Sequence, residues 1–149
     1  MNCQPIGIVK SPLTDGVDKG WGEIRSEIHV FKQFAPGLKG IESFSHIIVI
    51  FEMHKSSWNA DTDLVRHPQG RTDMPLVGIF VQRAKHRPNP IGVTTVQLIG
   101  VHENVLQVKG PDAIDGSPVL DAKPYFPQYE KVTNPRTPEW VDRLMSEYF

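Results

Sequence analysis

Cysteine is almost missing from this sequence, in which Cys3 is the only example. A single thiol cannot form a disulfide within the chain, and it cannot build a cysteine-based metal site. A chain of 149 residues buries enough surface to fold without such cross-links. The sequence therefore predicts one domain, over residues 1–149, that suits the reducing environment of the cytoplasm.

Long hydrophobic runs and an excess of one charge are missing as well. The longest nearly apolar stretch is Ile47–Phe51, whereas a helix needs about 20 such residues to cross a bilayer. The first residues also lack the charged start and apolar core of a signal peptide. Sixteen basic and seventeen acidic residues give a net charge of −1. This balance excludes a wholly basic nucleic-acid coat protein but allows a local basic patch.

Helix-breaking residues are, by contrast, abundant. Thirteen prolines and twelve glycines leave little room for long helices. Alternating or apolar segments at residues 6–9, 23–30, 45–53, 76–82, 93–101 and 105–109 predict strands. Short helices are expected at residues 36–44 and near the C-terminus, where Thr137 is the expected N-cap and Pro138 begins the first turn. The expected fold class is all-β: a small β-barrel with one or two short helices and a C-terminal helix.

The densest group of chemically active side chains is the turn from Arg83 to Gly92. Pro88 and Pro90 bracket Asn89 and fix the backbone beside four side chains that can carry positive charge. This arrangement suits a pocket for a carboxylate, a ribose or a phosphate. A basic surface turn that proline merely stiffens is equally consistent with the pattern.

A second polar segment runs from Asp112 to Tyr125. Within it, Asp115-Gly116 is typical of a tight turn, and Asp121 and Lys123 share one face of a short strand. A carboxylate, an ammonium group and the Tyr125 phenol in so short a stretch can form a polar site. A β-turn followed by a solvated edge strand explains the same residues without any site.

Motifs for the common nucleotide-binding folds and for metal binding are missing. The chain has no Gly-x-Gly-x-x-Gly loop, no Gly-x-x-x-x-Gly-Lys-Ser/Thr loop and no Gly-x-Ser-x-Gly elbow. Its six histidines do not show the spacing of a metal site, so no metal is expected. The residues alone indicate a rigid β domain whose basic turn suits a small anionic or zwitterionic ligand.

Three segments, in the same order, resemble the TsaA-like family, also called TrmO or YaeB. They are residues 40–46, residues 78–92 with their Arg-Pro-Asn-Pro-Ile-Gly turn, and residues 112–125 with Asp-Gly-Ser-Pro-Val-Leu-Asp-Ala-Lys-Pro-Tyr. The likeness extends from Ile6 to about Phe126. The family commonly has Ser-Pro where this chain has Ala84-Lys85, and many members have Pro-Arg-Gln where residues 17–20 stand.

The resemblance implies an S-adenosylmethionine-dependent tRNA methyltransferase built on a small β-barrel. Such proteins methylate the exocyclic nitrogen of threonylcarbamoyl-adenosine next to the anticodon. The resemblance also implies a homodimer with the cofactor near the subunit interface. Asp121, Lys123 and Tyr125 are candidates for orienting the methyl acceptor, and no base is assigned. The cofactor contacts that the resemblance implies here are His54, Lys55, Arg83, Val93, Asp115, Gly116, Ser117 and Pro118, with Arg87 and Asn89 shaping the pocket.

Two other functions remain open at this point. The chain can use S-adenosylmethionine with a different acceptor, or it can be a cofactor-binding or RNA-binding module without turnover. The near-neutral charge argues against broad RNA contact by one subunit. A dimer that pairs two basic turns would gather more positive charge.

Overall fold

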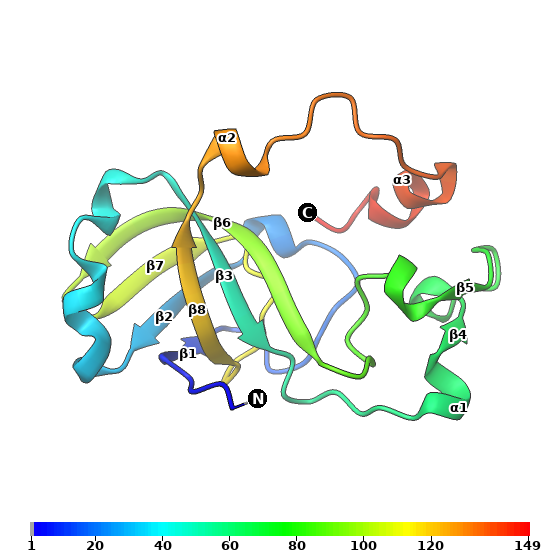
Figure 1. Ribbon diagram of the computed structural model, residues 1–149, viewed down its shortest axis with the longest axis horizontal. Helices are drawn as coiled ribbons and strands as arrows, with labels where there is room; N and C mark the ends of the chain where they lie inside the picture. Colours follow the sequence, from blue (N-terminus) through cyan, green and yellow to red (C-terminus); the bar gives the residue numbers. More distant parts are fainter. Residues whose placement is uncertain (1) are drawn as a thin grey trace.

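Six strands form a closed antiparallel barrel in the computed structural model, which describes residues 2–149 (Figure 1). All neighbouring strands in the barrel pair in antiparallel fashion. The predicted β-barrel is therefore confirmed. Around the barrel the order is β1 (Gly7–Lys10), β2 (Arg25–Val30), β7 (Val105–Lys109), β6 (Ile91–His102), β3 (His46–Glu52) and β8 (Pro118–Pro124).

The hydrophobic core fills the interior of the barrel. Strand β3 lies between β6 and β8, and its inward side chains Ile47, Val49 and Phe51 are each 2% exposed or less. Ile48 on the other face of β3 is also buried, as expected for a strand that is apolar on both faces. Burying side chains of this size contributes about 1.5–3 kcal/mol each, so the interior is a main source of stability. The opposite wall supplies Ile28, Val30, Leu106 and Val108.

A close approach between β3 and β6 explains the glycine that follows the proline-rich turn. Gly92 pairs with Phe51 in the antiparallel register. A Cβ atom at position 92 would overlap the Phe51 ring, so a larger residue does not fit there. Further along, β6 and β7 form a hairpin, and Glu103 adopts a positive φ of 52° in its turn.

The segment at residues 76–82 differs from its prediction as a buried strand. Only Val77–Gly78 form a strand, β5, and the chain then turns into the 3₁₀ helix η5 (Ile79–Val81). Strand β5 pairs with β4 (Val65–Arg66) in a small sheet outside the barrel. Ile79 is buried, but Phe80 is 77% exposed. The prediction was wrong because an apolar run does not reveal whether a partner strand lies beside it.

The helix expected at residues 36–44 is also different. The structure has two 3₁₀ helices, η2 (Lys32–Leu38) and η3 (Ile41–Ser43), separated by Gly40 with a φ of 89°. Pro36 lies inside η2 instead of at a first helical position. Leu38 and Ile41 nevertheless pack against the barrel core.

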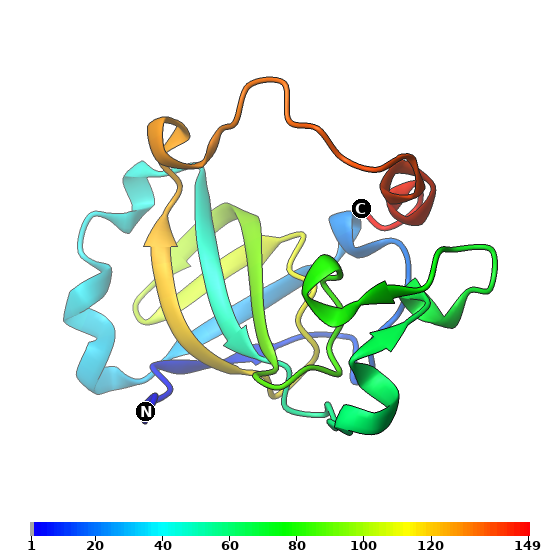
Figure 2. The ribbon, with the colours of Figure 1, turned by 45° about the vertical axis from the view of Figure 1, so that its right-hand side comes forward.

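A second lobe, which comprises the elements of residues 60–81, and the C-terminal segment flank the same side of the barrel (Figure 2). The C-terminal segment leaves β8 through α2 (Pro127–Glu130) and reaches α3 (Glu139–Met145), which lies beside the second lobe (Figures 1 and 2). Pro138, and not Thr137, occupies the N-cap position of α3, because the extended backbone continues through Pro138. Besides β4, β5 and η5, the second lobe contains α1 (Ala60–Asp63) and η4 (Pro68–Gly70).

The end of the chain returns to the barrel. The backbone N–H groups of Gly20 and Trp21, at the 3₁₀ helix η1 (Trp21–Glu23), donate to the carbonyl oxygens of Glu147 and Tyr148, each across 2.9 Å. These bonds fix the last residues beside the loop that follows β1. No helix within residues 2–149 combines the length and the apolar character that crossing a membrane requires.

Candidate active site

Two adjoining cavities open between the barrel, the second lobe and the C-terminal segment. The smaller has a volume of about 520 Å³ and borders the turn at residues 83–93. The larger has a volume of about 990 Å³ and extends to the loop at residues 15–18 and to α3. Small-molecule sites have volumes of about 300–1,000 Å³, so both are large enough for a ligand. Phe51, Met53, Gln82, Arg83 and Asp112 line both cavities.

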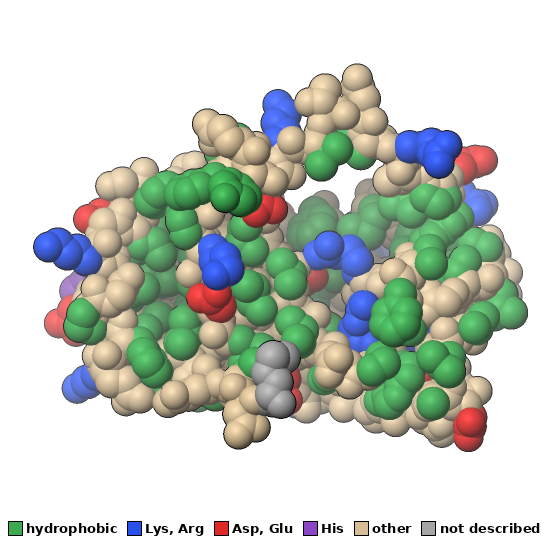
Figure 3. Space-filling model, in the orientation of Figure 1, with side chains coloured by type: hydrophobic (Ala, Val, Ile, Leu, Met, Phe, Trp, Pro, Cys, Tyr) green, Lys and Arg blue, Asp and Glu red, His purple; other side chains and the backbone are tan. Residues whose placement is uncertain are grey.

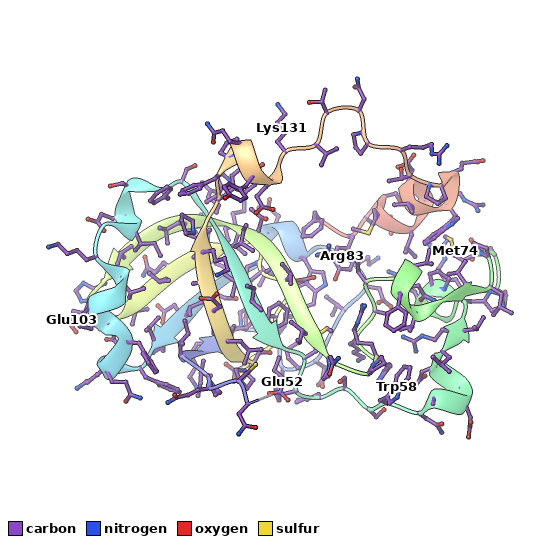
Figure 4. The ribbon with its side chains drawn as sticks, viewed as in Figure 1. Glu52, Trp58, Met74, Arg83, Glu103 and Lys131 are labelled. Carbon is purple, nitrogen blue, oxygen red and sulfur yellow. The ribbon has the colours of Figure 1, made fainter. Side chains whose placement is uncertain are left out.

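Arg83 stands at the boundary of the two cavities. It follows η5 in the chain and lies between β6 and the second lobe (Figure 4). Its Nη2 donates to the carbonyl oxygen of Val93 across 2.6 Å. Arg87 is fixed similarly, because its Nη1 donates to the carbonyl oxygen of Gln82 across 3.0 Å. Each guanidinium has five N–H donors, so both keep donors for an anionic ligand.

The turn from Arg83 to Gly92, called the proline-locked turn below, is hydrogen-bonded to the elements on both sides of it. The Met53 N–H, just after β3, donates to the carbonyl oxygen of Pro90 across 2.7 Å. On the lobe side, His86 Nδ1 lies 2.8 Å from the carbonyl oxygen of Ser57. Pro88 and Asn89 line the smaller cavity. The turn therefore presents a fixed wall to a ligand.

The loop before β8 meets the end of β3. Ser117 Oγ lies 3.3 Å from His54 Nδ1, although the two residues are 63 positions apart. Gly116 adopts a φ of 81° next to the His54 ring, and Asp115 Oδ1 accepts the backbone N–H of Ser11 across 3.1 Å. Of these residues Ser117 lines the larger cavity, and the others support its loop.

Lys55 also lines the larger cavity. Its Nζ donates to the carbonyl oxygen of Thr14 across 2.8 Å and lies 3.4 Å from Asp15 Oδ1. Pro118 begins β8 directly behind the loop and lines neither cavity. The predicted cofactor contacts are thus divided, with Lys55 and Ser117 in the larger cavity and Arg87, Asn89 and Val93 in the smaller.

The three candidates for orienting the acceptor lie elsewhere in the subunit. Lys123 Nζ pairs with Asp121 Oδ2 across 2.6 Å, beside the outward-facing Ile48 and Ile50 of β3. The Tyr125 ring packs edge-on against His46, at the opposite end of β3 from His54. None of the three lines either cavity, so within one subunit the structure does not bring them to the cofactor contacts. Their role stays a prediction.

Residue-by-residue reasoning missed two side chains at the boundary. Asp112 lines both cavities, and its Oδ2 accepts a hydrogen bond from the Tyr148 hydroxyl across 3.1 Å. Gln82 is buried, and its amide nitrogen donates to the carbonyl oxygens of Arg66 and Val77, each across 3.0 Å. Asp112 opens the second polar segment of the sequence, but no local pattern places Tyr148 beside it.

Two buried oxygens at the boundary have no hydrogen-bond partner among the described residues: Gln82 Oε1 and Asp112 Oδ1. Leaving a buried polar atom unpaired costs about 1–3 kcal/mol, so such atoms point to a ligand that pairs with them. Burial also raises the pKa of the Asp112 carboxyl above its ordinary value, although the Tyr148 hydroxyl, the Arg83 charge and the Thr94 hydroxyl all lower it.

Positive charge gathers around the cavities despite the net charge of −1. Figure 3 shows Lys and Arg side chains at the rim of the hollow between the barrel and the second lobe. Within residues 2–149 no three His, Cys, Asp or Glu side chains are placed to hold a metal ion. The basic side chains that line the cavities are Lys55, Arg66, Arg83, Lys85 and Arg87.

Comparison with known proteins assigns the chain to a family. Residues 17–131 match the family described as the tRNA-methyltransferase O N-terminal domain. The chain belongs to the tRNA-methyltransferase O family. The matched residues include all the predicted cofactor contacts, and also Gln82 and Asp112 with their unpaired oxygens.

Relatives within the tRNA-methyltransferase O family differ in length. The chain is 42% identical over 137 residues to an S-adenosyl-L-methionine-binding protein of Archaeoglobus fulgidus, with 89% of this chain and 94% of the relative covered. It is 33% identical over 142 residues to the tRNA (adenine(37)-N6)-methyltransferase of Escherichia coli, with 87% and 59% covered. The crystal structure of TrmO from P. aeruginosa matches with a TM-score of 0.75 and 28% identity, covering 94% of this chain and 61% of that one.

Proposed function

We propose that this chain transfers the methyl group of S-adenosylmethionine to the exocyclic nitrogen of adenosine 37 in tRNA, on the base that carries a threonylcarbamoyl group. The observation that carries the proposal is the pair of adjoining cavities beside the proline-locked turn of a tRNA-methyltransferase O family member. Methyl transfer requires the cofactor and the acceptor base to be held in line, and the two adjoining cavities together provide the space for both. The E. coli relative is named as a methyltransferase that acts on N6 of adenine 37 in tRNA.

The residues that line the two cavities suit S-adenosylmethionine, which carries a carboxylate, an ammonium group, a ribose and an adenine. Arg83 and Lys55 supply donors for the carboxylate or the ribose, and Ser117 supplies a hydroxyl. The unpaired Gln82 Oε1 can accept an N–H from the ammonium group or the adenine. Because the predicted contacts are divided between the cavities, we place the cofactor across their boundary at Arg83.

Alignment is the main task of such a site. The methyl group of a sulfonium ion is already activated, so holding the acceptor nitrogen in line with it supplies much of the acceleration. The carbamoyl group makes the neighbouring N–H more acidic than that of a plain amine. A weak base is therefore sufficient to remove the proton.

We also propose that two copies of the chain act together on tRNA in the cytoplasm. The family resemblance supports a homodimer, as does an apolar surface beside the basic turn, where Leu76, Phe80 and Val81 are 62%, 77% and 59% exposed. Pairing two subunits would double the number of basic side chains available to tRNA phosphates. Light scattering at micromolar concentration should give twice the subunit mass of 16.8 kDa, and a monomer would reject the dimer.

Mass spectrometry of tRNA nucleosides tests the main proposal. The purified protein is incubated with S-adenosylmethionine and tRNA that carries threonylcarbamoyl-adenosine, and the digested nucleosides should show one added methyl group on that base. Unmodified tRNA is the matched control. Methylation of another nucleoside would favour the alternative acceptor, and cofactor binding without any methyl transfer would favour a binding module.

A further inference from the structure

The boundary between the two cavities is the place where the methyl group has to be transferred. In S-adenosylmethionine the sulfonium lies between the amino-acid end and the nucleoside end. A cofactor with one end in each cavity therefore has its methyl group at the boundary, next to the five residues that line both cavities. This placement of the cofactor rests on the proposed function.

Only one of those five residues can take up a proton at neutral pH. Phe51 and Met53 are apolar, Arg83 is permanently charged, and Gln82 is a neutral amide. Asp112 is the remaining residue, and it carries a carboxylate.

One oxygen of the Asp112 carboxylate is hydrogen-bonded, and the other is buried without a partner among the described residues. Oδ2 accepts the hydrogen bond of the Tyr148 hydroxyl across 3.1 Å, which fixes the carboxylate plane. Oδ1 is buried and has no partner among residues 2–149. The ionisable groups that act on the carboxylate are Tyr148 from the C-terminal segment and Arg83 from the turn after η5, and the neighbouring Thr94 hydroxyl also lowers its pKa. The Arg83 charge favours the ionised form.

We propose that Asp112 is the general base of the methyl transfer and that its Oδ1 receives the proton of the acceptor nitrogen. The bond between that nitrogen and the methyl carbon forms while the bond between the methyl carbon and sulfur breaks. The sulfonium keeps the electron pair of the broken bond and leaves as neutral S-adenosylhomocysteine. The proton of the acceptor nitrogen moves to Asp112, which becomes a neutral carboxylic acid, and bulk water later removes it.

The raised pKa of the Asp112 carboxyl supports this role. Burial raises the pKa of Asp112, and a carboxylate with a raised pKa is a stronger base than an exposed one. The Tyr148 hydrogen bond lowers the same pKa. Tyr148, which lines the larger cavity, therefore tunes the base through this hydrogen bond, and we assign it as a positioning residue.

Single-turnover methylation with Asp112→Asn tests the proposal. The asparagine Oδ1 can still accept the Tyr148 hydrogen bond, but it cannot take a proton. We expect the rate constant at saturating cofactor and tRNA to fall about 100-fold or more. The cofactor dissociation constant should change less than about threefold. The matched control is Asp61→Asn, an exposed carboxylate in α1 whose loss should leave the rate unchanged.

The pH dependence supplies a readout that a structural role does not move. The wild-type rate should rise with pH through the pKa of Asp112 and then reach a plateau. Tyr148→Phe removes a bond that lowers this pKa, so the rising limb should move to higher pH. Because Tyr148→Phe keeps the carboxylate, this test holds even if Asp112→Asn fails to fold.

The outcomes separate this inference from the proposed function. If the wild-type protein binds the cofactor but methylates no tRNA, the proposed function fails. If the wild type methylates tRNA and Asp112→Asn keeps the full rate, Asp112 is not the base. A variant with weaker cofactor binding but an unchanged saturated rate would likewise overturn the proposal, because Asp112 would then only bind the cofactor. An unshifted pH limb in Tyr148→Phe would overturn it as well.

Discussion

Arg83 Nη2 donates a hydrogen bond to the carbonyl oxygen of Val93 across 2.6 Å. The bond joins the loop after η5 to the start of β6, so the guanidinium stays at the boundary of both cavities. Because the contact is exposed and a carbonyl oxygen is its only protein acceptor among residues 2–149, it adds little to folding. Arg83 should therefore matter for binding more than for stability.

Arg83→Ala should weaken S-adenosylmethionine binding while the fold persists. Charge-assisted hydrogen bonds contribute about 1.5–3 kcal/mol, which corresponds to about tenfold or more in the dissociation constant. Calorimetry in the presence of excess chelator measures the constant and tests at the same time whether binding needs a metal. Arg71→Ala is the control, because Arg71 pairs with Asp73 on the surface and lines neither cavity. An unchanged constant with normal circular dichroism would remove Arg83 from the site.

Replacing Pro88 and Pro90 together by Ala should weaken cofactor binding without altering Arg83 or Arg87. The freed backbone has to be ordered when the ligand binds, at a cost of up to about 1 kcal/mol per residue. Calorimetry should show that the loss is mainly entropic, at a temperature where the double variant is fully folded. Pro135→Ala, in the exposed connection before α3, is the control. A lower unfolding midpoint with unchanged affinity would mean that the turn is only scaffold.

Gly92→Ala should destabilise the barrel. The added Cβ would overlap the Phe51 ring in the core, and such overpacking costs about 1–3 kcal/mol. Gly37→Ala is the matched control, because nothing lies within 4 Å of a Cβ at that position. Urea unfolding compares the two variants with the wild type. Equal free energies of unfolding for both variants would contradict the close approach.

The Asp112 carboxyl should make stability fall as pH rises. Its pKa in the folded protein is raised by burial, above the ordinary value of 3.8 expected for the unfolded chain. Between these two pKa values the folded state binds more protons than the unfolded state, so the free energy of unfolding decreases with rising pH. Asp112→Asn cannot ionise and should remove this decrease. Urea unfolding of both proteins from pH 4 to pH 7 measures it, and parallel curves would refute the effect.

The barrel itself was predictable from local pattern. Alternating residues such as Ile28 and Val30 mark a half-buried strand, and the apolar run Ile47–Phe51 marks a central one, because side chains on a strand alternate between two faces. The segment at residues 76–82 shows the limit of this reasoning. Its apolar run resembles a barrel strand, yet it forms a short strand and a 3₁₀ helix with Phe80 exposed. Strand pairing depends on which distant segment is available, and composition does not record that.

Part of the candidate site was likewise predictable from local sequence, and part depended on the tertiary structure. The sequence alone determined the basic proline-locked turn and the Asp115-Gly116 turn, because both depend on backbone preferences of adjacent residues. Only the tertiary structure placed Ser117 against His54, 63 positions away, and Tyr148 against Asp112, 36 positions away. Closure of the barrel and the return of the C-terminal segment create these contacts, and no local pattern encodes either distance. That Asp112 Oδ1 is buried and unpaired therefore depends on the tertiary structure and not on the local sequence.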